Sequence, residues 1–423
     1  MMRADLLIHS AAQLVTCAGP GPKRGAAMRE VGMIRDGAVA IADGRIVAVG
    51  ASDEIRAQVR AEQNVDASGK VICPGFVDPH THVVYAGDRI DEFEMRIRGQ
   101  TYMEIMAAGG GIVSTMRAVR NASVRQLVAE TRPRLDAMLH LGATTAEVKS
   151  GYGLDVTSEL NMLDAADHLD ATYPMDIVPT FLGAHAIPPE FAGRADDYTA
   201  FVINDMLPAA WEWYQQSHFA AAKVPCFVDV FCEQNAFDVD QSRRILTAGQ
   251  ALGFAVKAHV DEFTSLGGVE MALELNAISI DHLDVTSPDD IARVAKSDTV
   301  AVVIPAVNFN LGATHFADAR GLIDAGAALA LCTDINPGSA PCPSMPFVMA
   351  LACRYQKLLP AEAMNASTLN AAYAIGMGDR IGSIETGKQA DLLIVNATDY
   401  RHLAYQFGGN LVEHVIKHGQ FVI

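Results

Sequence analysis

The chain has 423 residues, of which 50% are hydrophobic and 19% are charged, and its formal net charge is −18. Half apolar content is typical of a globular protein and excludes an intrinsically disordered chain or a disulfide-stapled miniature. The acidic balance, with no basic stripe, excludes nucleic acid and anionic membranes as expected partners. An anionic substrate would need a local cation or a metal, because the global field repels it.

The cysteines and the apolar runs indicate in which compartment of the cell the protein is expected. Seven cysteines occur without a CxxC pair, which is typical of reduced thiols in a cytoplasmic protein. Polar residues interrupt the apolar residues near the N-terminus, and no run of ~20 apolar residues occurs. We therefore expect a cytoplasmic protein with neither a signal peptide nor a transmembrane span.

Short β segments occur near both ends of the sequence. Near the N-terminus, strands are predicted at 6–16, 38–42 and 46–50, the last two joined by an Asp43-Gly44 turn. Near the C-terminus, short strands are predicted at 384–387, 391–396 and 412–423, with a turn at 417–420. We expect one composite β-sandwich domain built from residues 1–70 and 383–423.

The middle of the chain, residues 71–382, alternates apolar runs with helical stretches. Two helices are predicted at 124–141 and 239–252, each followed by a glycine. The eight apolar runs are 75–79, 145–149, 177–182, 227–232, 255–258, 277–280, 300–304 and 328–332. This alternation favours an α/β fold with a (β/α)8 TIM-like barrel, and an open doubly wound sheet is the alternative.

Polar residues follow several of these strands at their C-terminal ends, where such barrels place catalysis. His80 and His82 follow the first run, and residues two apart on an extended segment share a face. His259 follows the fifth run, His282 the sixth and Asp334 the eighth. The competing interpretation makes the last two histidines core residues and Asp334 a helix cap.

Four of these side chains form a ligand set for one divalent transition metal. Three imidazoles and one carboxylate suit zinc, which we favour, or iron. Such an ion lowers the pKa of a bound water and supplies hydroxide near neutral pH. The predicted ligands are His80, His82, His259 and Asp334.

This combination of motifs resembles the amidohydrolase superfamily, metal-dependent barrel hydrolases that carry a β-sandwich built from both termini. The resemblance starts from the Pro-Gly-Phe-Val-Asp-Pro-His-Thr-His run at 74–82 and covers essentially the whole chain. Longer stretches are similar to one group of cyclic-amide hydrolases within the superfamily. They are residues 80–89, 99–102, 108–112, 147–153, 182–188 and 333–339.

The resemblance implies hydrolysis of a cyclic amide C–N bond, with a heterocycle deaminase of the same superfamily as the alternative. It also implies a single metal, because members with two metals usually carry a carboxylated lysine after the fourth strand, where this chain has Glu233. Lys149 follows the second strand instead. Its role stays open, with an ion pair to Glu147 or Glu233 as one interpretation.

Three residues are candidates for proton transfer. Glu262 lies three residues past His259, close enough to face the substrate ring and move a proton. His282 is expected beside the attacking water or the developing oxyanion, and Asp334 could shuttle a proton while ligated. Their separate roles stay open. An alternative makes Glu262 the cap of a helix that starts near Thr264.

A substrate carboxylate requires a cation, and a guanidinium binds it through a bidentate fork. Arg89 is the expected cation by position and by resemblance. Its rivals are Arg96, Arg98 and Arg117. The resemblance carries over further substrate contacts, although Tyr152 and His185 could instead be buried packing residues. These contacts are Tyr152, His185, Glu262, Asn336, Gly338 and Ser339.

The sequence thus predicts a mononuclear metal hydrolase for a small anionic molecule, and we expect a homodimer. The competing hypothesis from a different class of protein is a catalytically silent assembly protein. It would be marked by loss of metal ligands, and none is lost here.

Overall fold

The barrel strands form one parallel sheet in sequential order, β8 to β15. The computed structural model describes residues 1–100, 104 and 110–423, so the motifs expected at 99–102 and 108–112 lie partly outside the described residues. The strands are β8 (Phe76–Asp78), β9 (Ala143–Lys149), β10 (Asp176–Ala184), β11 (Phe227–Cys232), β12 (Ala255–Val260), β13 (Ser279–His282), β14 (Val300–Val303) and β15 (Leu329–Leu331). Each overlaps one predicted run, so the predicted eight-stranded parallel architecture is confirmed.

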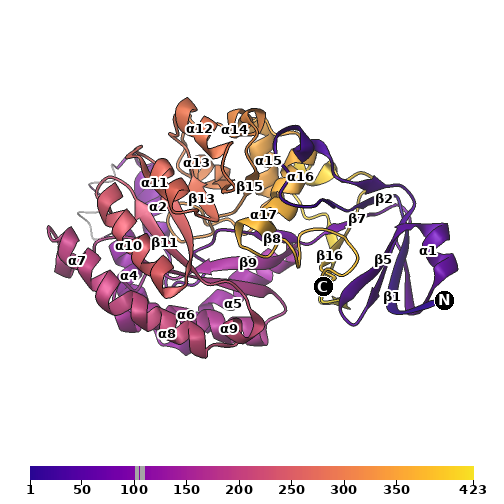
Figure 1. Cartoon of the computed structure of the whole chain (residues 1–423), viewed down its shortest axis with the longest axis horizontal. Coiled ribbons are helices and arrows are strands. Elements are labelled where there is room, and N and C mark those ends of the chain that lie inside the picture. Colours follow the sequence, from indigo (N-terminus) through magenta and orange to yellow (C-terminus); the bar gives the residue numbers. More distant parts are fainter. Residues whose placement is uncertain (101–103, 105–109) are drawn as a thin grey trace.

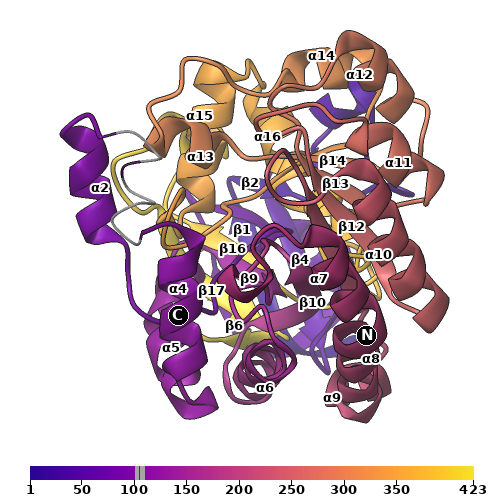
Figure 2. The ribbon, with the colours of Figure 1, turned by 90° about the vertical axis from the view of Figure 1, so that its left-hand side faces the viewer.

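Helices surround these strands and cover the outside of the barrel (Figure 2). The predicted helices are confirmed as α5 (Val124–His140) and α10 (Val239–Leu252), and the glycines after them adopt positive φ. The other helices are α2 (Ile90–Ile97), α4 (Ile112–Asn121), α6 (Val156–Thr172), α7 (Ala195–Phe201), α8 (Leu207–Gln216), α9 (His218–Ala222), α11 (Gly268–Glu274), α12 (Pro288–Val294), α13 (Pro305–Asn310), α14 (Ala319–Ala325), α15 (Met345–Tyr355), α16 (Pro360–Ala366), α17 (Leu369–Ala374) and α18 (His402–Tyr405).

The segments that follow the first and last barrel strands are joined by hydrogen bonds. The backbone N–H of His82 donates to the carbonyl of Ile335 at 3.0 Å, and that of Asp334 donates to the carbonyl of His80 at 3.1 Å. Just below, the Asp78 carboxylate accepts from the backbone N–H of Thr333 at 3.0 Å and from its hydroxyl at 2.5 Å. These bonds bring the two ends of the sheet together at the site of the predicted ligands.

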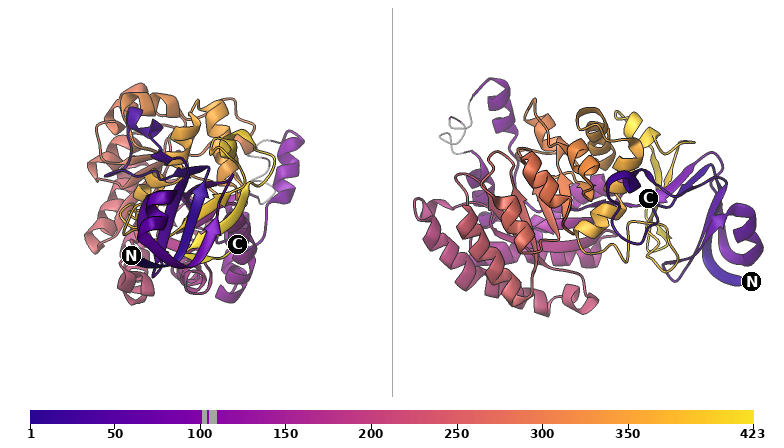
Figure 3. Two further views of the ribbon diagram at one scale, coloured as in Figure 1. Left: turned by 90° about the vertical axis from the view of Figure 1, so that its right-hand side faces the viewer. Right: turned by 45° about the horizontal axis from the view of Figure 1, so that its top comes forward.

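Segments from both ends of the chain form two further sheets at one end of the molecule (Figures 1 and 3). One has the order β5-β4-β1-β6 and the other β18-β17-β16-β7-β2-β3. Ile8 and Ile41 of the first sheet pack in one core with Ile72, Ile394 and Ile416 of the second, so the predicted small sandwich is confirmed. The strands are β1 (Met2–Ala11), β2 (Gln13–Val15), β3 (Met33–Ile34), β4 (Gly37–Ala42), β5 (Arg45–Ala51), β6 (Val59–Asp66), β7 (Val71–Pro74), β16 (Leu392–Val395), β17 (Val412–Lys417) and β18 (Gln420–Phe421).

The sandwich differs from expectation in three places. The single strand predicted at 6–16 divides into β1 and β2, which enter different sheets, and Ser10 has a φ of 62° before the division. The strand predicted at 384–387 is wrong: it is a turn, with Gly387 at a φ of 94°. Helix α1 (Ser52–Gln58) and β6 were not predicted. Strand β7 lies within the segment expected to form the barrel, yet it pairs with β2 and β16.

Among the described residues, no helix combines the length and apolar character that crossing a bilayer requires.

Candidate metal centre and active site

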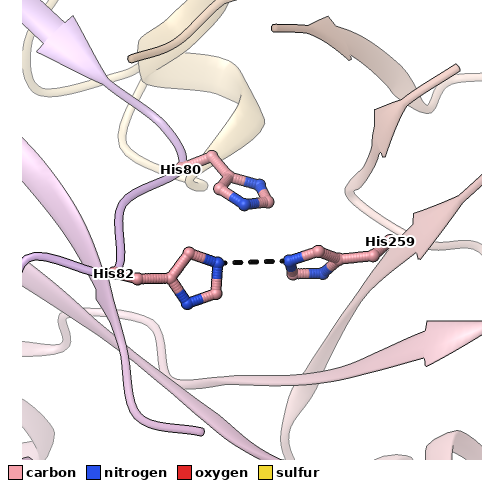
Figure 4. A group of neighbouring side chains, drawn as sticks. All are labelled: His80, His82 and His259. Carbon is pink, nitrogen blue, oxygen red and sulfur yellow. Dashed lines mark hydrogen bonds between the residues drawn. The ribbon is translucent and has the colours of Figure 1, made fainter. Parts of the chain in front are cut away.

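Three histidines from two barrel strands point toward one another at the carboxyl end of the barrel (Figure 4). His80 and His82 lie on the extended segment after β8, and His259 lies near the end of β12. All three are buried, and Asp334, after β15, is also buried beside them. The structure therefore brings the four predicted ligands together, although they are up to 254 residues apart in the sequence.

The spacing of these ligands fits one ion. Nε2 of His259 lies 3.4 Å from Nε2 of His82, and Oδ1 of Asp334 lies 3.5 Å from Nε2 of both His80 and His82. Tetrahedral ligation at bond lengths of about 2.0–2.1 Å places ligand atoms about 3.3–3.4 Å apart. The separations therefore match those around a zinc-sized cation.

The unsatisfied atoms at the centre point to the same conclusion. Nε2 of His80 and Oδ1 of Asp334 are buried and have no hydrogen-bond partner among the described residues. Burial lowers the pKa of both His80 and His82 well below 6.5, so these imidazoles are neutral, which is the form that binds metals. Burial also raises the pKa of the Asp334 carboxyl well above 3.8, so ionised Asp334 requires a cation. The donor set fits a divalent metal.

Left-handed backbone conformations recur at the ends of the strands that hold the site. Asp261 has a φ of 54°, His282 of 82° and Asp334 of 50°. Such conformations are unfavourable for residues with a side chain and persist where the surroundings enforce them. Here they turn the chain sharply just after β12, β13 and β15, at the point where side chains must face the barrel axis.

Glu262 and His282 lie next to the ligands. Oε2 of Glu262 is 3.7 Å from Nε2 of His282, and His282 also lies within ligating distance of His80 and Asp334. Burial and the carboxylates of Asp334, Asp284 and Glu233 raise the pKa of Glu262 well above 4.5. A carboxyl group with a raised pKa is suited to general acid–base chemistry near neutral pH.

The alternative role for Glu262 as a helix cap is wrong. The next helix, α11, begins at Gly268, and its cap is Gly267. Glu233 instead holds this loop, because its Oε2 accepts from the backbone N–H groups of Phe263 at 2.9 Å and Thr264 at 3.0 Å. Glu233 therefore fixes the backbone next to Glu262 and makes no ion pair with Lys149.

Arg89 lies against the loop that follows β15. Its Nε donates to Glu92 at 2.9 Å and a terminal nitrogen lies 2.8 Å from the same carboxylate. A β-carbon placed on Gly338 would overlap the guanidinium. Arg96 donates to the Gly338 carbonyl at 2.9 Å. The other two rivals point away, since Arg98 is 72% exposed and pairs with Glu94, and Arg117 is exposed.

The aromatic substrate-contact candidates stack around His82. The ring of His185 is stacked on that of His82, with centroids 4.8 Å apart and an interplanar angle of 15°. Tyr152 lies 5.7 Å from His82 and 5.3 Å from His185, centroid to centroid. Burial and the Asp334 carboxylate raise the pKa of Tyr152, so its hydroxyl stays protonated and can donate a hydrogen bond.

The 336–339 loop is organised by Asn336. Its Oδ1 accepts from the backbone N–H groups of Gly338 at 2.8 Å and Ser339 at 2.7 Å, and its Nδ2 donates to the carbonyl of Asp334 at 2.7 Å. The Asn336 side chain thus shapes the loop from within. Gly338 is the residue of this loop that faces the Arg89 guanidinium.

Sequence reasoning assigned no role to several buried charges directly below the ligands. Nδ1 of His80 lies 2.7 Å from Asp281, and Nδ1 of His259 lies 2.9 Å from Asp229. Lys149, whose role was open, lies 2.7 Å from both Glu147 and Asp229. The available signal was a charged residue within an apolar strand, as at position 229 in Phe227–Cys232.

Two parts of the chain match family profiles. The amidohydrolase family profile matches residues 252–422. The profile of an imidazolonepropionase-like composite domain from bacteria matches residues 37–58, which include β4 and β5 of the sandwich.

Solved structures share the fold at low sequence identity. An adenosine deaminase from Xanthomonas campestris with bound zinc has a TM-score of 0.71 and 19% identity, covering 99% of this chain and 93% of the other. A triazine hydrolase variant has a TM-score of 0.73 and 15% identity, covering 99% and 94%. These neighbours support the barrel with its terminal sheets.

Curated relatives match over the full length. The imidazolonepropionase of Chloroflexus aggregans is 60% identical over 100% of this chain and 99% of its own length. That of Herpetosiphon aurantiacus is 52% identical over 100% and 98%, and that of Geobacillus kaustophilus is 47% identical over 99% and 98%. With this identity over its whole length, and with an amidohydrolase profile over its C-terminal part, the chain belongs to the imidazolonepropionase family of metal-dependent amidohydrolases.

Proposed function

We propose that the chain opens the cyclic amide of 4-imidazolone-5-propanoate with water and gives N-formimidoyl-L-glutamate. The observation that supports this most is the buried group of His80, His82 and His259, with Asp334 3.5 Å from the first two, in a chain 60% identical to a curated imidazolonepropionase over its full length. The deaminases among the structural neighbours have 16–19% identity and share only the fold, so they do not favour the deaminase alternative.

One divalent ion would be held by His80, His82, His259 and Asp334. When bound, it supplies a Lewis acid that polarises the ring carbonyl and acidifies the attacking water. We propose zinc rather than iron, because three imidazoles and one carboxylate at these separations suit its tetrahedral preference. Elemental analysis of the purified protein tests both identity and stoichiometry.

In the reaction, the water oxygen bonds to the ring carbonyl carbon, and the bond from that carbon to the ring nitrogen breaks. Glu262 accepts the water proton and returns one to the departing nitrogen, for which its raised pKa is suited. His282, whose Nε2 lies 3.7 Å from Glu262, stabilises the developing oxyanion. Asp334 is the alternative carrier of the proton. The former carbonyl becomes the new carboxylate.

Substrate orientation would come from the opposite wall of the site. Arg89 binds the propanoate with the guanidinium edge that Glu92 leaves open. The Tyr152 hydroxyl donates to the substrate, and His185 stacks on His82 and lines the ring site. Asn336 keeps Gly338 and Ser339 in place, so that a backbone surface without side-chain bulk faces the substrate.

Further proposals concern the domain bounds, the oligomeric state and the cellular location. Because β7 (Val71–Pro74) pairs within the sandwich, we propose a sandwich of 1–74 with 383–423 and a barrel at 75–382. We also propose a cytoplasmic homodimer that binds neither nucleic acid nor membranes. Tyr405 and Phe407 are 70% and 58% exposed and offer apolar area that a second copy would cover. Light scattering of the wild type and of Phe407→Asp tests the dimer.

The decisive assay incubates the purified protein with fresh 4-imidazolone-5-propanoate. The proposed reaction gives formimidoylglutamate. A heterocycle deaminase would leave this substrate unchanged, because the ring carries no exocyclic amino group, and would instead release ammonia from an amino-substituted ring such as guanine. No formimidoylglutamate from this substrate, together with ammonia release from guanine, would overturn the proposal in favour of the deaminase.

A further inference from the structure

Five charged side chains lie completely buried in the barrel, directly below the candidate metal centre. Two are lysines and three are carboxylates, and each has 0% exposure. They come from the neighbouring strands β9, β11, β12 and β13. The five are Glu147, Lys149, Asp229, Lys257 and Asp281. Such a cluster is costly to bury unless its members are paired, so its retention requires an explanation.

Lys149 is the centre of this cluster. Its Nζ lies 2.7 Å from Oε1 of Glu147, 2.7 Å from Oδ2 of Asp229 and 3.7 Å from Oδ2 of Asp281. Burial opposes the charged ammonium, but these three carboxylates outweigh that effect and raise the pKa of Lys149 above 10.5. The lysine is therefore a permanent cation within the barrel.

Two of the carboxylates near this cation also contact the candidate metal ligands, although only Asp229 accepts a hydrogen bond from Lys149 and Asp281 lies equally far from Lys257, at 3.7 Å. Oδ2 of Asp281 lies 2.7 Å from Nδ1 of His80, and Oδ2 of Asp229 lies 2.9 Å from Nδ1 of His259. A carboxylate at Nδ1 places the proton there and leaves the Nε2 lone pair for the metal. Among the described residues, Nδ1 of His82 has no hydrogen-bond partner, and Nδ1 of His259 is close to Asp229 without a well-aligned hydrogen bond.

We propose that Lys149 is a positioning residue: it fixes Asp229 and Asp281 from below, so that both present Nε2 of their histidines to one ion. This inference rests on the proposed ligation by His80 and His259. This arrangement disfavours carboxylation of Lys149, because a carbamate at Nζ would place another anion against Glu147 and Asp229. Removal of such an indirect support typically costs 10–100-fold in metal affinity.

Lys417 provides a matched control. It is 3% exposed and pairs with two aspartates, Asp391 at 2.7 Å and Asp176 at 2.8 Å. It lies on β17 of the sandwich and contacts no proposed ligand. Lys417→Met therefore removes a buried lysine between two carboxylates, as Lys149→Met does, but away from the metal centre.

The test measures Zn²⁺ affinity by competition with a chromophoric chelator and records the absorption spectrum of the Co²⁺-substituted protein. We expect Lys149→Met to bind Zn²⁺ 10–100-fold more weakly and to show altered Co²⁺ ligand-field bands, whereas Lys417→Met should match the wild type in both. Wild-type affinity and spectrum in Lys149→Met would overturn the inference, as would equal losses in the two variants.

Two further variants keep the test decisive. If Lys149→Met does not fold, Asp281→Asn retains the two shortest ion pairs of Lys149 and removes the charge beside His80. Unchanged Zn²⁺ affinity in that variant would also overturn the inference. His80→Ala separates this inference from the metal assignment. Loss of Zn²⁺ in His80→Ala but not in Lys149→Met refutes only the role of Lys149, whereas retention in both refutes the ligand set.

Discussion

Replacing Arg89 with alanine should weaken substrate binding and leave the chemical step nearly intact. Glu92 occupies Nε and part of one terminal nitrogen, so the substrate carboxylate can use the outer edge of the guanidinium. Charge-assisted hydrogen bonds from that edge are worth about 1.5–3 kcal/mol net, roughly 10- to 150-fold in affinity. The propanoate lies away from the carbonyl under attack, so the contact is equal in ground and transition states. KM should therefore rise while kcat changes little.

A substitution at Gly338 should displace the Arg89 guanidinium without removing it. A methyl group on Gly338 would overlap the Arg89 guanidinium, and Glu92 and the adjacent backbone limit the space into which the guanidinium can move. Gly338→Ala should therefore also raise KM and spare kcat. Arg89→Lys keeps the charge but loses the planar fork, so its KM should fall between those of the wild type and Arg89→Ala.

Steady-state kinetics of these variants decide the point, with Arg98→Ala as the control because Arg98 is 72% exposed. An unchanged KM in Arg89→Ala, combined with a raised KM in Arg96→Ala, would refute the reasoning and move the cation to Arg96. A large fall in kcat with an unchanged KM would show that Arg89 acts on the reacting atoms instead.

Three further predictions concern the metal, the proton and the domain contact. Elemental analysis should find one metal per chain in the wild type and none in His80→Ala/His82→Ala; full occupancy in the double variant would contradict the ligand set. Glu262→Gln should keep its metal and lose on the order of 10²–10⁴ in kcat, and near-normal turnover would exclude Glu262 from proton transfer. The hydrogen bond from His418 to Asp176 raises the pKa of His418 above 6.5. The stability that this bond contributes is full below pH ~6.5 and is lost as pH rises through the raised pKa. Thermal melts of His418→Ala should therefore differ most from the wild type in mild acid, and a difference that grows toward alkaline pH would contradict this.

The barrel was predictable because its strands are buried on both faces and therefore appear as apolar runs. Residues 227–232, for example, form β11 with the predicted bounds. The turn at 384–387 was not predictable from the sequence. Ile384 is buried, as a strand residue would be, although its backbone N–H donates only to the carbonyl of Thr16, outside any strand pairing. A short apolar stretch does not specify whether the backbone pairs along its length.

The ligand positions were predictable from their place at strand ends, but the support below them was not. The ion pair of Lys149 with Glu147 on the same strand was one predicted interpretation. The contacts of Asp229 with Lys149 and His259 join different strands, so they depend on the register between β9, β10, β11 and β12. The register between these strands cannot be predicted from a single sequence. The same holds for Glu233, whose bonds to the loop beyond β12 depend on adjacent strands ending together.

The central claim is hydrolytic opening of a cyclic amide, and product analysis in water enriched with heavy oxygen tests it most directly. The purified holoenzyme is incubated with 4-imidazolone-5-propanoate, and the product is analysed by mass spectrometry. We predict formimidoylglutamate with one labelled oxygen in the new carboxylate and no ammonia. An unreacted ring, or formimidoylglutamate with no label above an enzyme-free control, would contradict the account.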